Sequence, residues 1–136
     1  MQECGSLGIL ELKVFNRDIT LRDLGGLRGK KCMKENVVCE KSFQLAKEIV
    51  FLYQYLPREK REYVLSKQLL RSGTSVGANI SEGVVGQSKK DFCNRLSIAY
   101  KESRETEFWL KLLCATGYLT SEKARTGENA CNDENR

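Results

Sequence analysis

The stretch from Arg71 to Gly83 places three glycines and four hydroxyl side chains inside a segment whose apolar residues otherwise follow helical periodicity. Each glycine in a helix interior costs about 1 kcal/mol relative to alanine, so such a helix must regain stability through close backbone approach to a neighbour. The stretch lacks the Gly-Lys-Ser/Thr ending of a phosphate-binding P-loop. We therefore expect a helix-packing face, with Gly73 and Gly77 spaced for contact between helices.

Apolar residues recur at threes and fours over three segments, which predicts amphipathic helices at about 37–56, 59–82 and 88–116. Pro57 is expected to end the first helix, because a proline pushes the preceding residue out of helical space. Ser88 with Asp91 three residues later predicts an N-cap for the third. Short connections favour antiparallel neighbours. The expected fold class is an all-α, antiparallel, up-down helical bundle.

The two ends of the chain differ in composition from this helical bundle domain, which we expect at residues 33–119. Residues 1–32 carry one weak strand-like alternation and several glycines, so we expect a poorly ordered leader. We expect Met33 to be an alternative start of translation, in which case the leader is not native. Residues 120–136 contain no Leu, Ile, Val, Phe, Trp or Tyr, which predicts a polar tail with no face to bury.

Composition argues against enzymatic activity. The chain has no histidine, which removes the commonest general base and metal ligand. Its six cysteines form no C-x-x-C pair and no signal segment precedes them, so we expect a cytoplasmic protein with reduced thiols. Glu102 and Glu105 lie one turn apart, but bundle metal sites with this spacing usually recruit Glu-x-x-His pairs. We predict no catalytic residue, no metal, no cofactor and no membrane association.

Two polar residues are expected to lie in the bundle interior and to fix its register. Asn79 flanks the apolar seam of the second helix, where an amide usually forms a hydrogen bond across the bundle. Glu107 falls on the buried stripe of the third helix and must find partners, because an unpaired buried carboxylate is costly. Its candidate partners, among which the sequence does not decide, are Asn79, Ser75, Arg71 and Arg104.

A second apolar stripe on the third helix predicts an oligomer interface, because a monomeric bundle needs only one buried face. Aromatic residues are enriched at subunit interfaces, and this stripe includes the only tryptophan. The alternative is that the stripe packs under another element of the same chain. The stripe consists of Ile98, Phe108, Trp109 and Leu112.

The net charge of +5 permits binding to nucleic acid or to an acidic partner without requiring it. Residues 33–119 carry 14 Lys and Arg against 10 Asp and Glu, with mixed signs that also suit a solvated helical surface. No aromatic-rich platform for single strands is evident. The candidate nucleic-acid surface consists of Lys67, Arg71, Lys89 and Lys90.

Four sequence blocks together resemble a known family. They are KSFQLAKEIVFLY at 41–53, LSKQLLRSGTSVGANISEG at 65–83, QSKKDF at 87–92 and LSIAYKESRETEFWLKLLCATGYL at 96–119. In this order they resemble the four helix bundle proteins called 23S rRNA-intervening sequence proteins. The family's fourth helix is amphipathic, whereas the segment after Leu119 is polar here, so the resemblance implies a fourth helix that is short or missing.

The resemblance implies a homo-oligomeric ring, with five subunits as the expected number, and no catalytic residues. A related protein, the accessory variability determinant of diversity-generating retroelements, is a basic ring that binds a reverse transcriptase and nucleic acid. The resulting hypothesis is a non-enzymatic scaffold that binds RNA or DNA through a basic surface. The alternative is a protein–protein interaction module that binds no nucleic acid. The salt dependence of binding distinguishes the two hypotheses, because nucleic-acid affinity falls steeply with ionic strength and the affinity of an apolar contact hardly changes.

Overall fold

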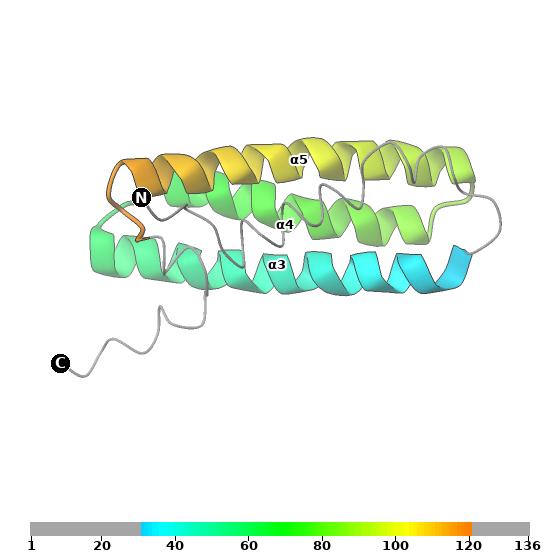
Figure 1. Cartoon of the computed structure of the whole chain (residues 1–136), viewed down its shortest axis with the longest axis horizontal. Helices are drawn as coiled ribbons and strands as arrows, with labels where there is room; N and C mark the ends of the chain where they lie inside the picture. The colour runs from blue at the N-terminus through cyan, green and yellow to red at the C-terminus, as the bar shows by residue number, and fades with distance from the viewer. Residues whose placement is uncertain (1–30, 121–136) are drawn as a thin grey trace.

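The computed structural model describes residues 31–120, with side chains from residue 37 onward, and contains three helices in this range. They are α3 (Lys31–Lys60), α4 (Leu65–Val84) and α5 (Lys89–Ala115). The helices lie side by side, and the chain reverses direction at each connection (Figure 1). The all-α prediction is confirmed for the described residues, which contain no strand.

Several expectations fall on residues that the structure does not describe. The leader and the polar tail lie in 1–30 and 121–136, outside the described residues, apart from their innermost positions. A fourth helix, short or missing, would follow residue 120 and therefore stays a prediction. None of the helices within 31–120 has the length and apolarity needed to cross a membrane.

The central helix of the three is α4, which packs against both neighbours, whereas α3 and α5 hardly approach each other. Its glycines permit this double contact. A Cβ built at Gly73 would lie 2.7 Å from Cγ1 of Ile49 on α3, and one at Gly77 would lie 3.3 Å from the carbonyl oxygen of Ser42. Within the packing face predicted for 71–83, Gly73 and Gly77 thus lie against α3.

On the α5 side, a Cβ at Gly83 would lie 3.0 Å from Cβ of Arg95. The core lies between the three helices and is dominated by leucine. Its buried apolar members are Leu45, Ile49, Leu52, Tyr55, Leu56, Leu69, Val76, Ile80, Leu96, Ala99, Leu110, Leu113 and Leu119.

The first helix is longer than the sequence predicted at both ends. It begins at Lys31 rather than near residue 37, and it continues through Pro57 to Lys60 rather than ending at Leu56. A proline lacks one backbone donor, so α3 loses one intrahelical hydrogen bond in its last turns. Leu56 is fully buried, so core packing holds the preceding residue in helical geometry against the usual steric preference.

The second helix begins at Leu65 rather than at Glu59, because Glu62 caps it. The Glu62 carboxylate accepts hydrogen bonds from the backbone N–H groups of Val64, Leu65 and Ser66 at 2.9, 2.7 and 2.7 Å. Arg61 precedes it with φ +54°, the left-handed geometry that commonly follows a helix end. The connection between α3 and α4 therefore covers residues 61–64.

The third helix starts as its cap pattern indicated. Ser88 is extended, and its Oγ accepts a hydrogen bond from the backbone N–H of Asp91 at 3.1 Å. The helix ends at Ala115, and Gly117 follows with φ +83°.

Candidate functional site

One candidate cation, Arg71, forms a bridge between α4 and α5. Its guanidinium pairs with the Glu105 carboxylate, and Nη1 lies 3.5 Å from Oε2 of Glu102. Trp109 Nε1 donates to Oε1 of Glu105 at 3.1 Å. This bond and the Arg71 guanidinium hold the pKa of Glu105 below its ordinary value, against the opposing effect of burial. Arg71 is therefore already neutralised by two carboxylates.

The three candidate lysines are all exposed but lie in two separate places. Lys67 is in the first turn of α4, whereas Lys89 and Lys90 open α5 at the opposite end of the bundle (Figure 1). About 25 Å of helix separates the two positions, at 1.5 Å per residue. A single copy of the chain therefore does not gather the four predicted cations into one patch.

Glu107 is buried and doubly paired. Arg104 Nη1 donates to its Oε2 at 2.8 Å, and Lys111 Nζ lies 2.7 Å from its Oε1. Arg104 is one of the four candidate partners, and both cations come from α5 itself. Glu107 therefore makes no polar contact with α4 among these pairs, and its buried charge is compensated locally.

Asn79 is half-buried and links α4 to α5 through an arginine. Its Nδ2 donates to the carbonyl oxygen of Ser75 at 2.8 Å, and its Oδ1 accepts from Arg95 Nη1 at 3.3 Å. Arg95 also pairs with Glu82 at 2.8 Å. The resulting contact crosses between the helices near the surface.

The fully buried polar contact between α4 and α5 is a pair of hydroxyls that was not predicted from the sequence. Thr106 Oγ1 lies 3.0 Å from Ser72 Oγ, and both residues are fully buried. The sequence holds a signal for this contact, because both hydroxyl residues occupy core-facing helical positions. Ser72 lies on the apolar stripe of the second helix, and Thr106 falls one turn before Leu110.

The predicted interface residues on α5 divide into two groups. Ile98 and Phe108 are 42% and 57% exposed. Trp109 and Leu112 are half-buried, and the Trp109 indole is fixed by its bond to Glu105. The rings of Phe108 and Trp109 meet edge to face with centroids 5.1 Å apart. Phe108 is thus a large exposed apolar side chain held against an anchored ring.

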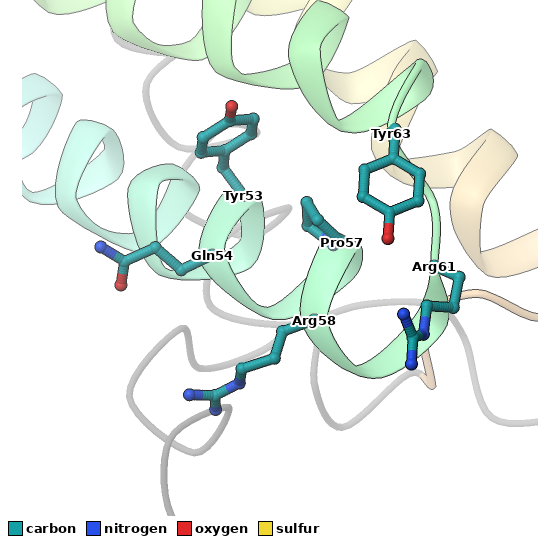
Figure 2. A pocket seen from close by; sticks show the side chains of 6 residues that line it. All are labelled: Tyr53, Gln54, Pro57, Arg58, Arg61 and Tyr63. Atoms are coloured by element: carbon teal, nitrogen blue, oxygen red, sulfur yellow. The ribbon is translucent and has the colours of Figure 1, made fainter.

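A concavity lies at the corner where α3 joins α4 (Figure 2). It has a volume of about 710 Å³. Figure 2 shows Tyr53 of α3 and Tyr63 of the connection on either side of Pro57. Sequence reasoning missed this site because the proline was expected to end the helix. The lining residues are Tyr53, Gln54, Pro57, Arg58, Arg61 and Tyr63.

The described side chains do not point to metal chemistry, because no group of three or more His, Cys, Asp or Glu residues within 37–120 is placed to hold a metal ion. The described surface carries exposed lysines, the exposed Phe108 ring on α5 and the concavity at the α3–α4 corner. These features belong to a small α-helical protein whose described helices form an antiparallel bundle.

The chain belongs to the 23S rRNA-intervening sequence protein family, whose model matches residues 34–136. This confirms the resemblance seen in the four sequence blocks. A similar solved structure is a protein of unknown function from the S23 ribosomal protein family of Bacteroides thetaiotaomicron VPI-5482. It shares 51% sequence identity with a TM-score of 0.63, covering 68% of this chain and 85% of that one. A comparison with curated proteins finds no match.

Proposed function

We propose that this chain is a non-enzymatic, cytoplasmic scaffold that assembles with copies of itself into a ring and binds RNA or DNA through basic surfaces. The expected ring has five subunits, each a bundle whose fourth helix is short or missing. The observation that carries the proposal is the exposed Lys89-Lys90 pair at the start of α5. Phosphate contacts need only distributed positive charge, and the positive end of the helix dipole adds to it.

Assembly would compensate for the separation of the lysines within one chain. In a closed ring whose bundles stand parallel to the rotation axis, the same end of every subunit lies on the same rim. Repetition of Lys89 and Lys90 around that rim would create a continuous basic band, with Lys67 repeated on the opposite rim. The exposed Phe108 and Ile98 on α5 are the proposed contacts between subunits, since large exposed apolar side chains favour burial.

The test is light scattering of the full chain with and without a structured RNA, at low and at high salt. The proposal expects an oligomer whose RNA complex forms at low salt and dissociates as salt is added. A monomer that binds no RNA at low salt would contradict it.

A second candidate function is a protein–protein interaction module whose partner covers the α5 surface. The exposure of Phe108 favours it, because aromatic anchors dominate the energetics of protein interfaces. A reverse transcriptase is one candidate partner, by analogy with the related retroelement protein. Binding of such a partner would change little with salt, which distinguishes it from phosphate contacts.

A further inference from the structure

The concavity at the α3–α4 corner combines two aromatic rings with two guanidinium groups. Its volume of about 710 Å³ is open to solvent over most of its extent. Tyr53 is half-buried and Tyr63 is 51% exposed, so both rings are supported by the protein and accessible from outside.

The two tyrosines supply stacking surfaces. Nucleobases stack on aromatic side chains without regard to sequence, because every base has a π-face. Figure 2 shows the Tyr53 and Tyr63 rings with Pro57 between them. Base-paired nucleotides cannot present their faces to such rings, so this arrangement suits a nucleotide that is unpaired.

One of the two arginines, Arg61, supplies positive charge next to the rings. Arg61 lies in the connection, and Arg58 is on the last turn of α3, where it pairs with Glu59 at 3.1 Å. The adjacent Glu62 does not neutralise Arg61, because its carboxylate faces inward and accepts hydrogen bonds from the backbone N–H groups of Val64, Leu65 and Ser66. The pKa of Glu62 lies below its ordinary value, since these bonds outweigh the opposing effect of burial.

Arg61 adopts a left-handed conformation that glycine or asparagine would adopt with less strain. The sequence nevertheless carries an arginine here, with its exposed side chain lining the concavity.

We infer that this concavity binds an unpaired nucleotide of single-stranded RNA or DNA, with the base stacked on Tyr63 and Tyr53 and the phosphate paired with Arg61. The inference rests on the proposed nucleic-acid function and assigns it a second site of different chemistry from the lysines of α5. The lysines contact the backbone of any strand, whereas the corner discriminates single strands from duplexes.

The experiment is fluorescence anisotropy of the full chain with a labelled oligouridine, and with a duplex of the same length. Tyr63→Leu removes the stacking ring while keeping apolar volume, and Tyr63→Phe keeps the ring. Phe43→Leu is the matched control, because Phe43 is an exposed aromatic residue on α3 that does not line the concavity. Tyr63→Leu is expected to weaken oligouridine binding by about tenfold, whereas Tyr63→Phe, Phe43→Leu and the duplex affinity stay unchanged.

A second variant separates binding from folding. Arg61→Gly relieves the left-handed strain, so its melting temperature is expected to equal or exceed that of the unchanged chain, while its oligouridine affinity falls. Lys101→Gln, which removes an exposed charge on α5, is the charge control. If Lys101→Gln lowered the oligouridine affinity as much as Arg61→Gly does, the assignment of the phosphate to Arg61 would be overturned.

The outcomes separate the inference from the function on which it rests. Equal binding of oligouridine and duplex, unaffected by Tyr63→Leu, would overturn the nucleotide site and leave the basic scaffold standing. Absence of binding to either nucleic acid at low salt would overturn both. If free uridine monophosphate bound more tightly than oligouridine, the ligand would be a free nucleotide and not a nucleic-acid strand.

Discussion

Gly73 of α4 lies so close to Ile49 of α3 that a Cβ at position 73 would fall 2.7 Å from Cγ1 and 2.8 Å from Cγ2 of the isoleucine. Ile49 is buried and β-branched, so its side chain has little freedom to move aside. The contact fixes the separation of the two helices and explains why the glycine-rich stretch belongs to a stable helix.

Gly73→Ala is therefore expected to destabilise the protein by about 1–2 kcal/mol. Overpacking of a core costs about 1–3 kcal/mol, and the better helix propensity of alanine returns about 1 kcal/mol at most. Gly77→Ala is the matched control, because its Cβ would lie 3.3 Å from the nearest atom and the propensity gain roughly balances the smaller crowding. Urea unfolding followed by circular dichroism measures both. Equal stability of the two variants would contradict the close contact.

A double-mutant cycle tests the same contact directly. Ile49→Ala removes Cγ1 and Cγ2, the two atoms nearest the added Cβ, and alone should cost about 2–5 kcal/mol. Combined with Gly73→Ala, it should relieve part of the crowding, so the double variant is more stable than the two single costs predict. Simple additivity would show that position 73 and position 49 do not interact.

Glu62 makes stability depend on pH in a defined direction. Its pKa is lowered from 4.5 in the folded chain, so its contribution is fully present above about pH 4.5 and is lost as the pH falls through the folded value. Glu62→Gln should cost about 1 kcal/mol at neutral pH, as loss of a helix cap does, and the difference from the unchanged chain should vanish in acid. Glu59→Gln, on the exposed side of the same turn, should show neither effect. Thermal melts across this pH range provide the measurement.

The described helices could largely be predicted from the sequence because their apolar periodicity is strong. The end of α3 and the start of α4 could not be predicted, because local sequence preferences competed there with core packing. Proline predicts a helix end at Leu56, yet the burial of that leucine keeps the last turn of α3 helical. Periodicity places Glu62 inside a helix that starts near Glu59. In the structure the chain turns at Arg61, and this turn brings the Glu62 carboxylate to the start of α4.

The site residues were harder to predict, for a geometric reason. Sequence periodicity places Lys67 and Arg71 on one outward face, but it does not reveal that Glu105 of another helix lies opposite Arg71. Tyr53 and Tyr63 are ten positions apart, a spacing that means nothing until the chain turns between them (Figure 2). Contacts across a helix–helix interface therefore decide which exposed residues remain available to a ligand.

The ion pairs predict which basic residues contribute to nucleic-acid binding. Arg71→Gln should leave affinity nearly unchanged, because its guanidinium already pairs with Glu105 and Glu102. Lys89→Gln with Lys90→Gln should weaken binding and reduce the slope of log affinity against log salt by roughly 0.9 for each phosphate of duplex DNA that the variant no longer neutralises. Salt titrations by anisotropy measure both slopes. A larger effect of Arg71→Gln than of the lysine pair would contradict the assignment.

Phe108 provides the sharpest test of self-assembly. Its ring is 57% exposed and lies against Trp109, so Phe108→Glu introduces a charge on the outer surface of α5 without disturbing the core. If this surface joins the subunits, the substitution leaves one buried, unpaired charge at every interface, which a specific contact does not tolerate. Light scattering should then show dissociation of the oligomer, while the circular dichroism spectrum keeps the helical content of the unchanged chain. Phe43→Glu, at a similarly exposed phenylalanine on α3, is the control and should leave the oligomer intact. If only Phe43→Glu dissociated the oligomer, the subunits would contact each other through α3 and not through α5.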